Sequence, residues 1–152
     1  MKAGRNLTET SEKGDLQSIW FSERSGKVSI IDQRHLPHRL VVEEIDTLEG
    51  MCTAIREMHL RGAPLIGVAA AYGMYLACRE AEGCAAAGRM EEAAGLLRAT
   101  RPTAVNLAWA VERQLRGLRG VGKPAKRTAS ALATAREERS YAFVLTSWVQ
   151  PG

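Results

Sequence analysis

The sequence predicts an α+β fold, in which a small antiparallel sheet is followed by a bundle of helices. Short apolar stretches separated by turn residues occupy residues 16–45, whereas apolar residues recur at helical spacing from residue 47 to about residue 117. The composition agrees with this pattern. Aromatic residues make up 5% of the 152 residues while alanine and glycine are abundant, which favours closely packed helices over an aromatic-rich β-sandwich.

Three strands are expected in this sheet. Residues 16–21 (Leu-Gln-Ser-Ile-Trp-Phe) and 27–32 (Lys-Val-Ser-Ile-Ile-Asp) flank the turn signal Ser25-Gly26 and predict a β-hairpin. Residues 40–45 (Leu-Val-Val-Glu-Glu-Ile) predict a third strand after a loop that contains Pro37. The polar segment 1–15 precedes these strands and is expected to be disordered.

A first helix is expected from about residue 47 to about Leu60, capped by Asp46 or Thr47. Its stripe of residues at helical spacing predicts core packing and consists of Met51, Cys52, Ile55, Met58 and His59.

The second helix is expected to lie at the centre of the fold. It starts at Pro64, whose missing N–H is not needed in a first turn, and runs to about Ala81. The helix is apolar on nearly all sides, so it must be buried on nearly all sides. Its small residues allow a neighbouring backbone to come close; they are Gly67, Ala69, Ala70, Ala71, Gly73 and Ala77.

Two further helices are expected, one from about Arg89 to Arg98 and one after Thr103, the expected N-cap of the last helix. The buried face of that last helix is supplied by Val105, Leu107, Ala108, Val111 and Leu115.

Two arginines mark a candidate anion site. Arg61 stands just before the second helix, and Arg101 stands just before the last one. The free N–H groups of a helix's first turn attract anions, most often phosphate. If the two helix starts converge, the two arginines and the N–H groups form a phosphate pocket. The alternative is two unrelated surface arginines, and the spacing alone does not decide between them.

Charge is unevenly distributed along the chain. Residues 114–152 carry seven Lys/Arg against two Asp/Glu, whereas the residues before them are close to neutral. A basic tail can bind nucleic acid, but this one has few aromatic residues and no recognisable nucleic-acid module. We therefore expect a solvated or unstructured tail. A nucleic-acid binder would instead show salt-dependent binding that disappears when residues 118–152 are removed.

The sequence does not favour a metal-binding, a disulfide-bonded or a membrane-spanning protein. Three cysteines (Cys52, Cys78 and Cys84) without a CxxC pair argue against a disulfide framework and a zinc site, and the three histidines lack metal-ligand spacing. No apolar stretch reaches the roughly 18 residues of a membrane-spanning helix, and no signal peptide is recognisable. A cytoplasmic location is the default expectation.

Two motifs in order carry a family resemblance. The segments Arg61-Gly-Ala-Pro-Leu-Ile-Gly-Val-Ala-Ala-Ala-Tyr-Gly73 and Arg101-Pro-Thr-Ala-Val-Asn-Leu107 resemble the N-terminal half of methylthioribose-1-phosphate isomerases. That family shares a superfamily with the regulatory subunits of translation initiation factor 2B. The resemblance covers about residues 16–117. It implies an aldose–ketose isomerisation in methionine salvage, from 5-methylthioribose 1-phosphate to 5-methylthioribulose 1-phosphate, without metal or organic cofactor.

The resemblance also implies site residues. It assigns substrate binding to Arg61, Gly62, Ala63 and Arg101. It places catalysis on a cysteine in a Thr-x-Cys-Asn-x-Gly segment and on an aspartate, both in a second, Rossmann-like half through which the family dimerises. Neither segment occurs here, so no catalytic residue is predicted and the chain alone is expected to be inactive as an isomerase.

The resemblance is expected to end where the basic residues begin, which suggests a frameshift or a premature end in the coding sequence. A natural short form is the alternative. Two other functions stay open, namely a non-catalytic regulatory module like the initiation-factor subunits, and an isomerase of another ribose phosphate.

Overall fold

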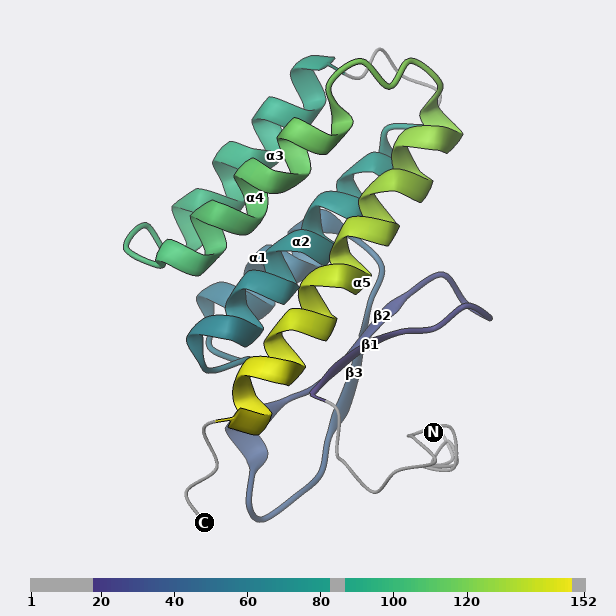
Figure 1. Ribbon diagram of the computed structural model, residues 1–152. Helices are drawn as coiled ribbons and strands as arrows, with labels where there is room; N and C mark the ends of the chain where they lie inside the picture. Colours follow the sequence, from purple (N-terminus) through teal and green to yellow (C-terminus); the bar gives the residue numbers. More distant parts are fainter. Residues whose placement is uncertain (1–17, 83–86, 149–152) are drawn as a thin grey trace.

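A three-stranded antiparallel sheet precedes five helices in the computed structural model, which describes residues 18–82 and 87–148 (Figure 1). This confirms the predicted α+β fold. The elements in chain order are β1 (Ile19–Phe21), β2 (Val28–Ile31), the 3-10 helix η2 (Gln33–His35), β3 (Val42–Ile45), α1 (Leu48–Arg56), α2 (Ala63–Glu80), α3 (Ala87–Thr100), α4 (Val105–Leu118) and α5 (Pro124–Trp148). The predictions for residues 1–15 and for Cys84 lie outside the described residues.

The sheet contains the predicted hairpin of β1 and β2, and β3 pairs with the other edge of β2, so that β2 lies between β1 and β3. Ile30 of β2 pairs with Ile19 on one side and with Glu43 on the other. Every residue of β2 is buried, because the middle strand packs against the helices while its edges are paired. The sheet therefore gives a fixed support for the segments that follow β2 and β3.

Helix α1 begins as expected and ends earlier than expected. The Thr47 hydroxyl accepts a hydrogen bond from the Gly50 N–H at 2.9 Å, which confirms Thr47 as the N-cap. The helix stops at Arg56, because Met58 adopts a left-handed backbone with φ 61°. The prediction that Met58 belongs to the buried stripe is wrong, since 43% of the residue is exposed.

Helix α2 is the central helix that its composition predicts. All of its residues from Ile66 to Cys78 are buried, and it contacts the other four helices and β1. Gly67 and Gly73 let neighbours approach closely, as expected: a Cβ on Gly67 would lie 3.2 Å from the Asn106 carbonyl oxygen, and one on Gly73 would lie 2.9 Å from Leu97 Cδ2. None of the helices in the described ranges combines the length and apolar character that crossing a membrane requires.

Residues 124–148 correct the expectation of an unstructured tail. They form α5, which packs along α2 (Figure 1). Ala131 and Ala135 are fully buried at helical spacing, and small side chains there let the two helices approach. Inside this contact the buried Gln114 of α4 donates from Nε2 to the carbonyl oxygens of Ala71 and Ala131, both at 2.9 Å. One amide thus ties α2, α4 and α5 together.

Candidate functional site

The start of α2 presents unsatisfied backbone donors. Gly62 is the N-cap residue, with φ 99° and ψ 133°, and it supplies no side-chain cap. Pro64 stands in the first turn and has no N–H, while the Ile66 N–H donates to the Gly62 carbonyl at 3.0 Å. Arg61, Gly62 and Ala63 are exposed. This helix terminus therefore faces solvent with its partial positive charge and an arginine beside it.

The start of α4 has the same character. The N-cap is Ala104, so the expectation of a Thr103 cap is wrong: the chain turns through a hydrogen bond from the Ala104 N–H to the Arg101 carbonyl at 3.0 Å, and the helix begins one residue later. Ala104 has no side chain able to cap. Arg101 is partly buried, and its Nη1 is buried without a hydrogen-bond partner among the described residues.

These two helix starts lie side by side. Helices α2 and α4 run alongside each other with their N-termini at the same end of the bundle (Figure 1). The contact between Gly67 and the Asn106 backbone joins the second turn of α2 to the first turn of α4. The fold thus places two uncapped helix N-termini together, each preceded by an arginine. Two partial positive charges and two guanidinium groups at one end of the bundle can attract a doubly charged anion.

The loop before Arg61 carries a polar cluster that sequence reasoning missed. His59 is buried, with Nδ1 2.7 Å from Glu43 Oε2 and Nε2 3.3 Å from Glu57 Oε2. Asp32, also buried, accepts hydrogen bonds from the Arg34 guanidinium at 2.7 and 3.0 Å. The only sequence signal was a histidine inside an apolar stripe, because Glu43 comes from β3 and Asp32 from the segment after β2.

The same cluster holds potential metal ligands. Within the described ranges, one ligand atom each from Asp32, Glu43 and His59 lies within 4.8 Å of the others. Both Asp32 oxygens already accept from Arg34, and the imidazole is already hydrogen-bonded to Glu43. A cation at this place would have to displace the Arg34 guanidinium, so the arrangement fits an internal ion-pair network better than a metal centre.

The Arg34 guanidinium lowers the pKa of Asp32 from 3.8 to about 2, chiefly through its hydrogen bonds. Since the pKa is lower in the folded chain, the ionised carboxylate stabilises the fold above about pH 4, and that stabilisation is lost as the pH falls toward 2. We expect a loss of about 1–2 kcal/mol in the free energy of unfolding across this interval, and Asp32→Asn should remove this part of the acid dependence. Urea unfolding at each pH measures it, with the exposed Asp46→Asn as control. An unchanged acid dependence in Asp32→Asn would contradict the assignment.

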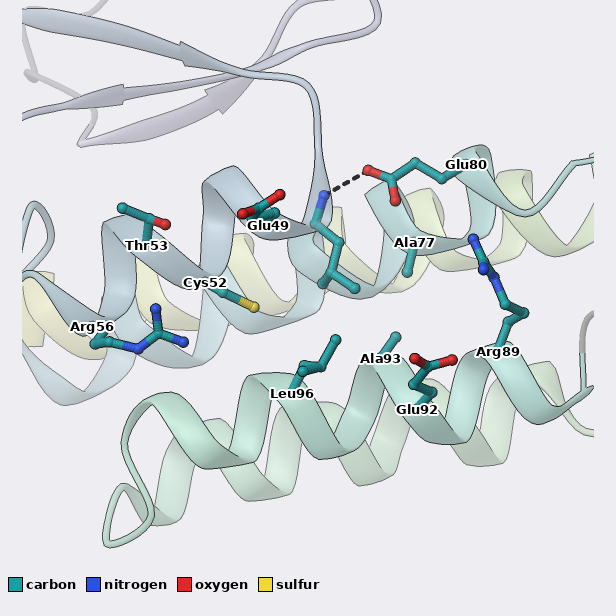
Figure 2. Close-up of a pocket in the computed structure, with 11 residues that line it drawn as sticks. Glu49, Cys52, Thr53, Arg56, Ala77, Glu80, Arg89, Glu92, Ala93 and Leu96 are labelled. Carbon is teal, nitrogen blue, oxygen red and sulfur yellow. Dashed lines mark hydrogen bonds between the residues drawn. The ribbon is translucent and has the colours of Figure 1, made fainter.

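A separate cavity of about 450 Å³ opens between α1, α2 and α3 (Figure 2). Cys52 of α1, Ala77 of α2 and Leu96 of α3 line it, and arginine and glutamate side chains stand around it in Figure 2. Burial raises the pKa of the Cys52 thiol, so the thiol is protonated at neutral pH and a poor nucleophile. Arg61, Gly62, Ala63 and Arg101 do not line this cavity, so it is distinct from the paired helix starts.

Comparison with known proteins points to one family. The model of the initiation factor 2 subunit family matches residues 59–142, which extends past residue 117 into α5. Methylthioribose-1-phosphate isomerases from Methylocella silvestris and Acaryochloris marina are each 48% identical, over 78% and 79% of this chain. The chain spans about a third of the length of these relatives (31% and 34%).

Solved structures agree with this result. The delta subunit of translation initiation factor eIF-2B from A. fulgidus matches with a TM-score of 0.74 and 35% identity, covering 82% of this chain and 36% of that one. 5-Methylthioribose 1-phosphate isomerase from Pyrococcus horikoshii matches with a TM-score of 0.73 and 27% identity, covering 91% of this chain and 39% of that one.

Proposed function

The chain belongs to the initiation factor 2 subunit family, and we propose that it supplies the phosphate-binding part of an aldose–ketose isomerase of methionine salvage. The substrate we propose is 5-methylthioribose 1-phosphate, which becomes 5-methylthioribulose 1-phosphate in the cytoplasm. The relatives named methylthioribose-1-phosphate isomerase support the reaction class, since two of them are 48% identical over more than three quarters of this chain.

The observation that carries the proposal is the pair of uncapped helix starts at one end of the bundle. A phosphate dianion bound there would accept hydrogen bonds from first-turn N–H groups of α2 and α4 and from Arg61 and Arg101. The unpartnered Nη1 of Arg101 supports this, because a buried guanidinium nitrogen without an acceptor is costly unless a ligand provides one.

These residues bind and orient; they do not transfer protons. Isomerisation moves a proton between adjacent carbons and needs an acid and a base within hydrogen-bond reach of them. Arginine is too basic to release its proton, and Gly62 and Ala63 offer only backbone groups. The proposed role is therefore to hold the phosphate so that other groups can act on the sugar.

Binding measurements on the full chain test the proposal. We expect 5-methylthioribose 1-phosphate and inorganic phosphate to bind, and Arg61→Ala or Arg101→Ala to weaken binding about tenfold to a hundredfold, as expected for losing one charge-assisted hydrogen bond. Arg116→Ala is the matched control, because it removes the same charge from the far end of α4 and should leave affinity unchanged. Equal losses in all three variants would show that only net charge matters and would reject the site.

A second candidate is a non-catalytic regulatory module. The 35% identity to a structure named as eIF-2B subunit delta favours it. Such a module need not bind a sugar phosphate, so the same titration discriminates between the two. Binding of 5-methylthioribose 1-phosphate that Arg61→Ala and Arg101→Ala weaken supports the isomerase. Binding that prefers another ribose phosphate would instead redirect the proposal to that substrate.

A further inference from the structure

His59 joins the loop before Arg61 to the rest of the fold through its backbone. Its N–H donates to the Ala54 carbonyl of α1 at 2.9 Å, and its carbonyl accepts from the Gln33 N–H at 2.8 Å. The preceding Met58 has the left-handed φ of 61°, which turns the chain away from α1. The position of His59 therefore determines where Arg61, two residues later, lies on the protein surface.

The side chain of His59 faces a carboxylate on each of its ring nitrogens. Nδ1 lies 2.7 Å from Glu43 Oε2, and Nε2 lies 3.3 Å from Glu57 Oε2, while only 6% of the imidazole is exposed. An ionised carboxylate only accepts hydrogen bonds, and a neutral imidazole has a single N–H. Only the doubly protonated imidazolium can donate to both glutamates. In the neutral ring, one nitrogen lone pair would face a carboxylate oxygen.

The other charged groups near the imidazole come from the segment after β2. One carboxylate oxygen of Asp32 lies within 4.8 Å of a ligand atom of Glu43 and of a ring nitrogen of His59. Asp32 is paired with Arg34, and His35 Nε2 lies 3.5 Å from Asp32 Oδ2. Glu43 faces His59 from β3, and Glu57 faces it from its own loop. Because Arg34 neutralises Asp32, Glu43 and Glu57 are the carboxylates left to balance an imidazolium.

We propose that His59 is a positioning residue for the anion site. As an imidazolium it links Glu57, on the loop, to Glu43, on the sheet, and so holds the Arg61–Ala63 segment in its binding position. With a neutral imidazole the contact with Glu57 is lost and the segment loosens. This loosening of the Arg61–Ala63 segment, the loop effect, does not depend on a bound ligand. Its consequence for anion affinity rests on the proposed phosphate site.

The loop effect is tested first, by NMR on the full chain over a pH interval that covers both the protonated and the neutral ring. We expect both ring nitrogens of His59 to be protonated at the acid end, and the Arg61 and Gly62 amide signals to shift with the same midpoint as the ring. Glu57→Gln should abolish the amide shift, because a neutral ring can accept from the new amide group. His38→Gln, at an exposed histidine, should leave it intact.

Two results would overturn the proposal. The first is Arg61 and Gly62 amide signals that do not follow the ring titration, and the second is an amide shift in Glu57→Gln that equals the shift in the parent chain. About half of the Glu57 side chain is exposed, so its variant should fold, and His59→Gln serves as a second test. It should remove the amide shift while keeping one hydrogen bond to Glu43.

Sulfate binding then separates this proposal from the proposed function, since sulfate keeps a constant charge over the interval. We expect about two- to fivefold weaker sulfate binding at the alkaline end in the parent chain, a modest change because Glu57 is half exposed, and no such change in Glu57→Gln. If the amides follow the ring but sulfate fails to bind, the phosphate site is wrong and the positioning role of His59 stands. If the parent chain binds sulfate with equal affinity at the acid and the alkaline end of the pH interval, the consequence proposed for anion affinity is overturned.

Discussion

Leu97→Ala should lower the free energy of unfolding by about 3 kcal/mol, one of the two largest effects expected in this fold. Leu97 lies on α3, is fully buried, and packs over Gly73 of α2. Truncation removes the apolar contact and leaves a cavity that the rigid central helix cannot fill. Urea unfolding measures the change. The neighbouring Leu96→Ala is the matched control, since Leu96 is 49% exposed and its loss should cost well under about 1 kcal/mol.

A double-mutant cycle with Gly73→Ala shows whether this contact is the cause. A Cβ on Gly73 would lie 2.9 Å from Leu97 Cδ2 and 3.4 Å from Met51 Cγ, so Gly73→Ala alone should destabilise by overpacking. Combined with Leu97→Ala, the new methyl group enters the vacated space. We expect the double variant to be more stable than the sum of the single effects by about 1 kcal/mol or more. Strict additivity would show that Leu97 acts through other contacts.

The central helix illustrates how much local sequence can determine. Pro64 at its start and a long apolar run predict a helix buried on nearly all sides, and burial from Ile66 to Cys78 confirms this. The three strands and the hairpin of the first two were also predictable, because each apolar stretch is short and bounded by turn residues. These features depend on residues close together in the chain.

Helix α5 could not be recognised in the same way. Its buried face is built on Ala131 and Ala135, whose small side chains give a weak apolar pattern beside many charges. Some of those charges are balanced only in the folded chain: Glu137 and Glu138 pair with Arg113 of α4, and Arg136 pairs with Glu23 at 2.8 Å. The basic composition of this segment therefore predicted a solvated tail, because its ion-pair partners lie in other segments of the chain.

In the candidate site, too, some features follow from local sequence and others depend on distant segments. Arg61 and Arg101 could be selected locally, since each precedes a helix start, but their neighbourhood depends on the contact of Gly67 with Asn106. The network around His59 brings Asp32 and Glu43, from two other segments, next to His59 and Glu57 of one loop. Hydrogen-bond geometry across such distances in the chain has no periodic signature, so only the folded structure shows it.

Gly62→Ala should weaken phosphate binding about tenfold or more. This is the largest effect on the site that we expect from a substitution that leaves the charge unchanged. Gly62 has φ 99°, which an alanine adopts only at a cost of about 1–3 kcal/mol. A Cβ there would meet nothing within 4 Å, so a steric clash cannot explain any loss. The strained peptide should instead rotate and turn the first N–H groups of α2, together with Arg61, away from the anion. Titration with inorganic phosphate measures the loss.

Gly95→Ala separates this backbone effect from the general consequence of adding a methyl group. Gly95 lies in α3, is exposed, and its Cβ would also meet nothing within 4 Å. Because its backbone is helical, alanine should stabilise the fold by up to about 1 kcal/mol and leave phosphate affinity unchanged. Arg61→Ala removes charge and keeps the backbone, whereas Gly62→Ala keeps charge and changes the backbone. If only Arg61→Ala weakens binding, the helix N–H groups contribute nothing and the anion is held by arginine alone.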